Sequence, residues 1–536
     1  MIPEKKAIIP THNRIHRIKE ILTGTGGWLR TNYDVMAFNL VWFLLLFEGR
    51  SKLFRDPGTF FHTAAGEYIL QSGQLIHHDP FSFTMYGKEW IAHQWLGECF
   101  MAFVHRLGGL DGLLAVTCFS IALLYSWITA KLCRAGINPV LGMLLVCLAF
   151  AASSHHLHVR PHLITIIALA IVYGKLCDVE ENRTSIVKLY TLIPLFIVWT
   201  NIHGGVLGGL LTMFIVFSGW SIARLTGIHT PIQSAKDLAL LWLVGFACAA
   251  TVFINPYGIS LPGTWFSIIG SSYIRESIQE HASVLTLLRH GDVSAFLIGT
   301  VLSILGILYI GLVSGTPRDR IRITWLIPLL WLMLSLYSNR HGPLFAATLM
   351  VAIADIYPHV VWVQQWSKKG INVLEMNATK GKHLKWPIRM TSFLAIAVGT
   401  LLTYSLVVKP VLGSDQWVTL DKKHWPLEHV VYLQKYQAAE PSGTPVFNDM
   451  LFGGFLIYYT PGMRVFIDDR WELYEDNFIS AYIHGGPNEF KEWERKYSFR
   501  IALVEPHSNY FQYLSSSKSW KAVLITESAV LYRKTQ

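Results

Sequence analysis

Long apolar runs recur along the chain and are separated by short polar turns. Each is long enough, or nearly long enough, to cross a bilayer as a helix, for which about 20 apolar residues are needed. The eleven runs lie at residues 33–49, 109–131, 138–153, 161–177, 188–201, 205–224, 237–254, 293–313, 323–338, 342–357 and 389–409, and the run at 188–201 has the weakest pattern. The pattern predicts a mainly α-helical, polytopic membrane protein with about 11 transmembrane helices.

The polar stretch at residues 50–108 has a different pattern. Within it, residues 59–71 and 93–107 alternate apolar and polar side chains at helical spacing. Such segments are typical of amphipathic helices that lie on a membrane surface. We expect these two helices to cover a cavity and to present acidic and histidine side chains along its edge.

The composition changes to that of a soluble domain after about residue 410. Four stretches there have strand patterns, separated by turns and helical stretches: TPVFNDMLFGGFLIYY, RVFIDDRWELY, RIALVEP and WKAVLITESAVLYRK, the last with a hairpin at Glu527-Ser528. The sequence therefore predicts a small α/β domain at 410–536, after a transmembrane domain at 33–409 and a basic tail at 1–32.

Composition and charge agree with a membrane protein and orient it. The chain is 52% hydrophobic and only 15% charged, whereas soluble domains have about 25% charged residues. The net charge of +10 comes without a basic stripe of interleaved aromatic residues, so nucleic-acid binding is not expected. With the N-terminus in the cytoplasm, 22 lysines and arginines lie inside and nine outside before residue 409. This bias favours a cytoplasmic N-terminus, and eleven crossings place the C-terminus outside.

Histidine was not needed for this orientation, yet it is concentrated on one side. Of 22 histidines, 13 lie in the outer loops of the transmembrane part, five inside and four in the terminal domain. Several occur in the outer turns SSHHLHVRPH, TNIHGG and YSNRHGP. A single interfacial histidine is best explained as capping or anchoring a helix. For the whole set we favour a functional cavity that opens to the outer face, because ionisable groups at membrane depth are costly.

Two aspartates in the first outer loop are candidates for a general base. A partly desolvated carboxylate at the membrane surface suits that role. Asp56 and Asp79 each precede a proline, however, and so also fit the N-cap of a helix. Both interpretations remain open for both residues.

Two short motifs in the terminal domain are candidates for a functional or structural role. Asp468, Asp469 and Arg470 follow a predicted strand and suit either acceptor binding or a structural salt-bridge cluster. Gly453-Gly454 suits a close approach of two backbones.

The stretch DPGTFFHTAAGEYILQSGQLIHHDPFSFTMYGKEWIAHQWLGE, residues 56–98, resembles the first outer loop of bacterial members of the GT-C superfamily of membrane glycosyltransferases. NPYG at 255–258, NRHGPLF at 339–345 and VFNDMLFGGFLIYYTPGMRVFIDDRWELY in the terminal domain are similar to the same proteins. The chain departs from their pattern at Phe61 and Gln94, where tryptophan and glutamate are expected.

The resemblance implies an enzyme of the bacterial inner membrane, with several membrane passes. It would transfer a sugar, with inversion, from a polyprenyl-phosphate carrier of the undecaprenyl-phosphate type to a glycan, lipid or protein acceptor on the extracytoplasmic face. The first-loop aspartate would take the acceptor proton, and basic residues would hold the leaving phosphate. No cofactor is required, and the chain contains neither an Asp-x-Asp nor a Trp-Trp-Asp signature that would support a divalent metal.

The candidate site residues follow from this resemblance and from the outer turns. Asp56 and Asp79 are the catalytic candidates; Arg160, Arg340, His162, His203 and His341 the candidates for donor phosphate; and His62, His93, Glu98, Asn255, Tyr257 and Glu280 the candidates for substrate binding.

Two other functions compete with glycosyl transfer. A transporter or flippase of a lipid-linked glycan predicts polar residues at mid-membrane depth and broken helices, but the interiors of these runs are nearly free of charge. A haem or metal redox protein predicts histidines that face one another within spans, and often a CxxCH motif, which the chain lacks.

Overall fold

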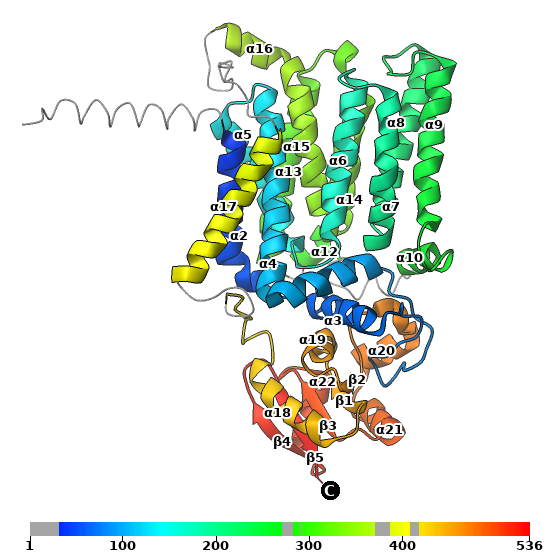
Figure 1. Ribbon diagram of the computed structural model, residues 1–536, viewed down its shortest axis with the longest axis vertical. Helices are drawn as coiled ribbons and strands as arrows, with labels where there is room; N and C mark the ends of the chain where they lie inside the picture. The colour runs from blue at the N-terminus through cyan, green and yellow to red at the C-terminus, as the bar shows by residue number, and fades with distance from the viewer. Residues whose placement is uncertain (1–31, 271–281, 290, 370–385, 408–416, 536) are drawn as a thin grey trace, which may run out of the picture.

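The computed structural model describes residues 32–270, 282–289, 291–369, 386–407 and 417–535. Glu280, the tail at 1–31 and residues 410–416 lie outside the described residues. Within the described ranges the molecule has two parts: a bundle of long helices and a smaller domain with a β-sheet at one end of that bundle (Figure 1).

A helix lies over each of the eleven apolar runs, so the prediction of a mainly helical protein is confirmed. These helices are α2 (Tyr33–Lys52), α4 (Trp95–Arg134), α5 (Pro139–Ser153), α6 (Leu163–Glu180), α7 (Leu192–Ile202), α8 (Val206–Thr226), α9 (Ala235–Ala250), α13 (Val293–Ser314), α14 (Leu326–Tyr337), α15 (Gly342–Ile356) and α17 (Trp386–Val407). Among the described residues, five helical segments are long and apolar enough to cross a membrane: Trp95–Arg134, Pro139–His156, Val206–Thr226, Ala235–Phe253 and Val293–Ser314. The count of eleven crossings stays a prediction.

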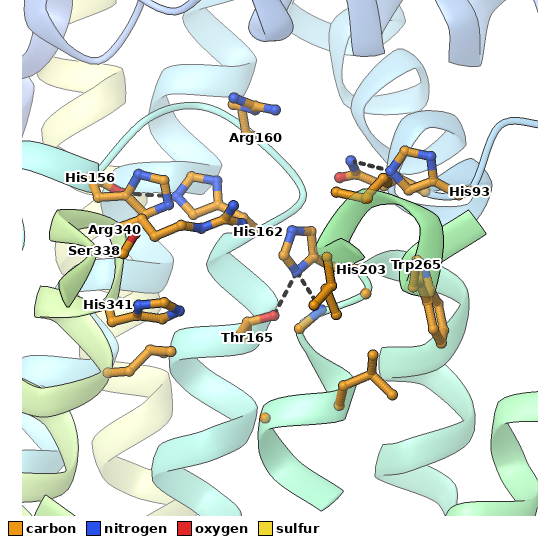
Figure 2. Close-up of a pocket in the computed structure, with 18 of the residues that line it drawn as sticks. His93, His156, Arg160, His162, Thr165, His203, Trp265, Ser338, Arg340 and His341 are labelled. Carbon is orange, nitrogen blue, oxygen red and sulfur yellow. Dashed lines mark hydrogen bonds between the residues drawn. The ribbon is translucent and has the colours of Figure 1, made fainter. Parts of the chain in front are cut away.

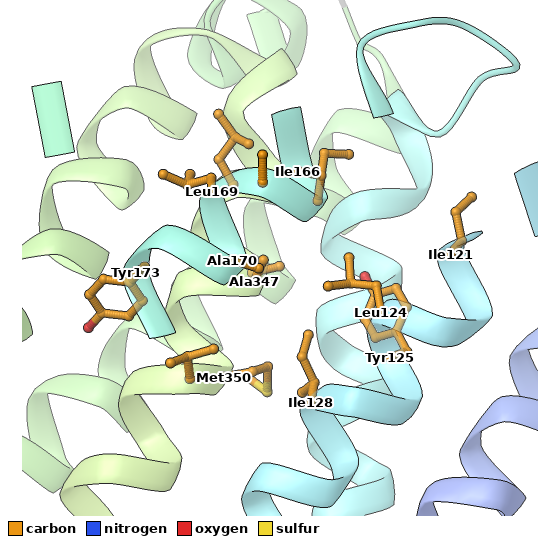
Figure 3. Close-up of a cluster of buried hydrophobic side chains, with 14 of the residues drawn as sticks. Ile121, Leu124, Tyr125, Ile128, Ile166, Leu169, Ala170, Tyr173, Ala347 and Met350 are labelled. Atoms are coloured by element: carbon orange, nitrogen blue, oxygen red, sulfur yellow. The ribbon is translucent and has the colours of Figure 1, made fainter. Parts of the chain in front are cut away.

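Helix α15 is the centre of the bundle and is buried on nearly all sides. Helices α4, α5, α6, α13 and α14 pack around it. Small residues such as Ala347 let its neighbours approach closely, and Figure 3 shows Ala347 and Met350 between α4 and α6.

Two helices of the first outer loop lie across the end of the bundle, as their pattern predicts (Figure 1). The first is α3 (Pro57–Ser72). The second is the beginning of α4, which is separated from the apolar remainder by a kink where Gly108 and Gly109 leave helical geometry. The two pack tightly, since a Cβ atom at Gly66 would lie 1.9 Å from the carbonyl oxygen of Glu98.

Shorter helices connect the long ones at both ends of the bundle. They are α10 (Ser260–Gly270), α12 (Val284–Arg289) and α16 (Val361–Lys368).

The C-terminal domain is an α/β domain, as expected. Its strands β1 (Thr444–Asn448), β2 (Met463–Val465), β3 (Ile501–Val504), β4 (Trp520–Ile525) and β5 (Val530–Lys534) form one sheet in the order β2-β1-β3-β5-β4. Strand β1 is parallel to β2 and β3, whereas β5 is antiparallel to β3 and β4. The hairpin predicted at Glu527-Ser528 joins β4 and β5. The helices are α18 (Leu427–Ala439), α19 (Met450–Tyr459), α20 (Asp476–His484), α21 (Pro487–Tyr497) and α22 (Asn509–Ser516).

The first outer loop and the C-terminal domain form a continuous structure. The loop adds to the open edge of the sheet, because the Phe83 N–H donates to the Val465 carbonyl at 2.9 Å and the Val465 N–H donates to the Phe81 carbonyl at 3.0 Å. Helix α19 lies against α3, where a Cβ atom at Gly454 would lie 2.4 Å from the Pro57 carbonyl oxygen. The domain is therefore fixed over the end of the bundle where the surface helices lie.

Candidate active site between the helix bundle and the C-terminal domain

A cavity of about 640 Å³ lies where the bundle, the surface helices and the C-terminal domain meet. Aromatic and aliphatic side chains, among them Trp265 and Trp331, form much of its wall. Its ionisable lining residues are His62, His93, Glu98, His156, Arg160, His162, His203, Arg340, His341, Asp469, Arg470 and Glu472. Mixed apolar and convergent polar walls are typical of a small-molecule site.

One wall carries the cationic and histidine side chains of three turns between helices. Figure 2 shows Arg160 and His162 before α6, His203 between α7 and α8, and Arg340 and His341 between α14 and α15. Polar turns at the ends of apolar helices place these groups at one level of the bundle.

The hydrogen bonds of His203 define its tautomer. The Gly205 N–H donates to His203 Nδ1 at 3.0 Å, and Thr165 Oγ1 lies 2.8 Å from the same nitrogen. Trp199 Nε1 donates to Thr165 Oγ1 at 2.9 Å and holds that hydroxyl in place. Since Nδ1 accepts, the neutral ring carries its proton on Nε2. His203 is thus a hydrogen-bond donor on the cationic wall.

Asp56 begins α3 and binds Arg160. Its Oδ1 accepts the Gly58 N–H at 2.7 Å, which is the N-cap bond that its sequence position predicts, and its Oδ2 accepts Arg160 Nη1 at 2.9 Å. Burial opposes ionisation of this carboxyl, but the charges of Arg160 and His158 outweigh burial and hold the pKa of Asp56 well below its usual range. Asp56 itself lies behind Arg160 and outside the cavity lining.

A buried histidine–glutamate pair lies on the side of the cavity that the two surface helices form. His62 Nδ1, on α3, lies 2.9 Å from Glu98 Oε1, in the part of α4 before the kink. Burial, reinforced by the charge of Glu472, raises the pKa of Glu98 to about 8. Burial also lowers the pKa of His62 well below its ordinary value. The pair therefore carries a proton on Glu98 and a neutral imidazole at neutral pH.

The segment from Asp468 to Glu472 closes the cavity from the C-terminal domain. Arg470 donates to Asp79 Oδ1 at 2.6 Å and to both oxygens of Asp468, at 2.6 and 2.8 Å. Its guanidinium also lies 4.7 Å from the ring centroid of Trp90. Glu472 accepts the Trp90 indole N–H at 2.9 Å. This cluster is a buried link between the two parts of the molecule.

Most of the residues predicted for the site do line the cavity. Arg160, Arg340, His162, His203, His341, His62, His93 and Glu98 are all found in its wall. The structure does not bring Asp56 or Asp79 into the wall: Asp79 is fully buried and its oxygens accept from Arg470, Phe81 N and Ser82.

Two further predicted residues lie away from the cavity wall. Asn255 closes its own turn, donating to the Val252 and Gly258 carbonyls and accepting the Tyr257 N–H. The Tyr257 ring packs edge-on against His77. Their role is to shape the turn before α10.

The structure adds residues that sequence reasoning did not assign to the site. Asp469 and Glu472 come from the C-terminal domain and His156 from the turn before α6. The sequence left acceptor binding and a salt-bridge cluster open for the segment Asp468–Arg470. In the structure Asp468 and Arg470 form the salt-bridge cluster, whereas Asp469 lines the cavity. In the part of the chain that the structure describes, no group of three or more His, Cys, Asp or Glu side chains is placed to hold a metal ion.

Comparison with known proteins identifies the fold. No family model and no curated protein matches the chain. Among solved structures it is similar to the archaeal oligosaccharyltransferase AglB from Archaeoglobus fulgidus in complex with an inhibitory peptide and a dolichol-phosphate, at 13% identity and a TM-score of 0.51 over 89% of this chain and 70% of that chain. A second Archaeoglobus fulgidus oligosaccharyltransferase structure, tethered with an acceptor peptide, gives 12% identity and a TM-score of 0.54 with the same coverage.

A third similar structure is ArnT from Cupriavidus metallidurans in the apo state. It gives 14% identity and a TM-score of 0.50 over 95% of this chain and 98% of that chain. At such identities the likeness is one of fold, and it extends over both the helix bundle and the C-terminal domain. The chain therefore shares its fold with these transferase structures, and its long apolar helices are those of a multi-pass membrane protein.

Proposed function

We propose that the protein is an inverting glycosyltransferase that moves a sugar from a polyprenyl-phosphate donor to an acceptor hydroxyl on the extracytoplasmic face of the membrane. The observation that carries the proposal is one cavity whose cationic wall, built from three inter-helix turns, faces carboxylates from the C-terminal domain. Such a pairing suits a reaction in which an anionic phosphate leaves while an acceptor hydroxyl loses a proton.

The cationic wall would bind the phosphate group of the donor. Arginine binds phosphate through two parallel N–H groups, and Arg160 and Arg340 approach from different turns. His203 would add the Nε2–H that its tautomer provides. Together these groups stabilise the negative charge that develops on phosphate as the bond to the anomeric carbon breaks.

The structural neighbours support a lipid-linked donor. The AglB structure holds a dolichol-phosphate, which is a polyprenyl phosphate. In this protein the apolar lining, with Trp265 and Ile269 from α10 and Trp331 from α14, lies beside the cationic wall and suits the first isoprene units of such a lipid.

The face of the membrane follows from charge. The cavity is lined by residues of the C-terminal domain, which lies at one end of the bundle (Figure 1), and the lysine and arginine bias favours that end as the outer one. We infer that donor and acceptor meet outside the cytoplasm, in the inner membrane of a bacterium.

Asp56 has a positioning role in this scheme. Both of its carboxylate oxygens accept hydrogen bonds, one from Gly58 N and one from Arg160. A strongly acidic, fully engaged carboxylate is a weak proton acceptor, so its contribution is to hold Arg160 toward the leaving phosphate. Asp79, bound to Arg470, anchors the C-terminal domain.

The test is transfer by purified protein in nanodiscs from radiolabelled polyprenyl-phosphate sugars, with an envelope extract as acceptor. We expect release of polyprenyl phosphate together with a labelled product, reduced on the order of 100-fold in Arg160→Gln and Arg340→Gln, whose charges serve the transition state. Arg320→Gln, an exposed arginine in the loop between α13 and α14, is the matched control and should equal the wild type. A wild type that moves a lipid-linked glycan across the bilayer without releasing polyprenyl phosphate would instead be a transporter.

A further inference from the structure

We propose that Asp469, from the C-terminal domain, is a further catalytic residue that accepts the proton of the acceptor hydroxyl. The inference rests on the proposed glycosyl transfer and assigns its general base to a different part of the chain from the first outer loop.

The geometry distinguishes Asp469 from the other carboxylates near the cavity. Among the described residues it forms no hydrogen bond or ion pair with another side chain, and its Oδ1 is buried without a partner. Glu98 is paired with His62, and Glu472 binds the Trp90 indole and lies 3.7 Å from His93. Glu98 Oε2 is also buried without a partner, but among the described residues Asp469 is the cavity-lining carboxylate that no hydrogen bond or ion pair joins to another side chain, so its acceptor capacity is left for a ligand.

The position of Asp469 is fixed by the residues before and after it in the sequence. Asp468 and Arg470 are held in the buried cluster with Asp79. Helix α19 packs on the preceding backbone so closely that a Cβ atom at Gly453 would lie 2.3 Å from the Ile467 carbonyl oxygen and 2.5 Å from Asp468 Cα. A reacting group needs such support to be held in a productive geometry.

The electrostatic surroundings suit a proton acceptor. Burial raises the pKa of Asp469 to about 7, with Arg160 opposing and Asp56 adding to that effect. A base whose pKa lies near the working pH combines ionisation with real affinity for a proton. Asp469 and Arg160, which we assign to the donor phosphate, line the same cavity.

In the transfer step one C–O bond forms as another breaks. The acceptor oxygen attacks the anomeric carbon from the face opposite the phosphate, and a new C–O bond forms. The bond from the anomeric carbon to the phosphate oxygen breaks, and its electron pair leaves with polyprenyl phosphate on the cationic wall. The acceptor proton passes to the ionised Asp469 carboxylate, which returns it to solvent. The acceptor is thus a compound with a hydroxyl group that enters beside the C-terminal domain.

The test compares Asp469→Asn, Asp469→Glu and Asp469→Ala with wild type in the nanodisc assay. For Asp469→Asn we expect a fall in kcat of about 100-fold or more, loss of the acidic limb of the pH–rate profile, and unchanged affinity for undecaprenyl phosphate. Asp469→Glu should keep part of the activity and the limb. Formate should partly restore transfer by Asp469→Ala, which a merely structural role would not allow.

The matched control is Asp476→Asn, an exposed aspartate of the same domain, which should keep the wild-type rate and limb. Two results would overturn the assignment of Asp469 as the base and leave the proposed function intact. One is an Asp469→Asn variant with the wild-type kcat and the acidic limb of the pH–rate profile unchanged. The other is loss of that limb in His62→Gln while Asp469→Asn retains it. A wild type that transfers no sugar from any donor would overturn the proposed function and this inference together.

Discussion

Arg470 of the C-terminal domain and Asp79 of the first outer loop form a buried ion pair with an N–O distance of 2.6 Å. The two residues are 391 positions apart in the sequence. Asp468 is a second carboxylate partner of Arg470, and the rings of Trp90, Phe61 and Phe81 surround the guanidinium. This cluster joins the two parts of the molecule directly beneath the cavity.

Removing one partner of this pair should destabilise the protein strongly. Asp79→Asn removes one of the two carboxylates that accept from the buried Arg470, and the loss of a buried hydrogen bond to a charged group costs about 1.5–3 kcal/mol. Thermal unfolding in detergent, followed by circular dichroism and by limited proteolysis of the C-terminal domain, measures the loss. Lys88→Gln is the control, because Lys88 also pairs across the two parts, with Glu475, but on the exposed surface, where a pair contributes at most about 1 kcal/mol. Equal stability of the two variants would contradict the proposed anchoring role.

Asp56→Asn should separate positioning from proton transfer. Asparagine still caps α3 through Gly58 N, whereas the charge that holds Arg160 is lost. We expect transfer to fall on the order of 10- to 100-fold through misplacement of Arg160, with a higher KM for the donor and with the acidic limb of the pH–rate profile retained. Steady-state kinetics between pH 5 and 9 provide the measurement. If the limb disappears while donor binding is intact, Asp56 is the base.

Asp469→Asn should be far less active and yet more stable than the wild type at alkaline pH. The folded state raises the pKa of Asp469 from the ordinary value to about 7, so folding favours the protonated carboxyl. The free energy of unfolding of the wild type therefore declines as pH rises from about 4 to 7, by at most about 4 kcal/mol, and stays level above that range. Asparagine has no such decline. The difference in melting temperature between Asp469→Asn and the wild type should be larger at pH 8 than at pH 5. Asp476→Asn should show no such pH-dependent difference from the wild type.

Gly66→Ala should disturb the site through helix packing. The new Cβ atom would lie 1.9 Å from the Glu98 carbonyl oxygen, which forces α3 and α4 apart and displaces Glu98 from His62. Overpacking of this kind costs about 1–3 kcal/mol, and we expect transfer to fall together with the melting temperature. Gly263→Ala is the control, since a Cβ atom there meets no atom within 4 Å. A neutral Gly66→Ala would show that the helix contact is not required.

Much of the fold could be predicted from the sequence because apolar runs of spanning length leave little choice but a helix. The surface helices were predictable from their amphipathic pattern. Helix α19 was not: MLFGGFLIYY is an uninterrupted apolar run with glycines, and such a run does not distinguish strand from helix. Its conformation depends on α3, against which Gly454 packs.

The cationic wall could be predicted for a different reason. Arginine and histidine in short outer turns have to meet at one end of the bundle, so Arg160, His203 and Arg340 were found together. The partners of Asp56 and Asp79 could not be predicted, because Arg160 and Arg470 lie 104 and 391 residues away. For Asp469 the sequence left acceptor binding and a salt-bridge cluster as alternatives, since nothing in it shows that the C-terminal domain closes over the cavity.

The pairing of Phe81 and Phe83 with Val465 has a consequence for biosynthesis. Neighbouring Thr84 donates to the Phe466 carbonyl across 382 residues of sequence, so the outer loop has to wait for nearly the whole chain to be made and inserted. Contacts this far apart form late, and until then both the loop segment and the edge of β2 expose unpaired backbone groups. The cavity therefore acquires its last wall only when the C-terminal domain has folded and docked against the outer loop, so the site is completed late in the folding of the chain.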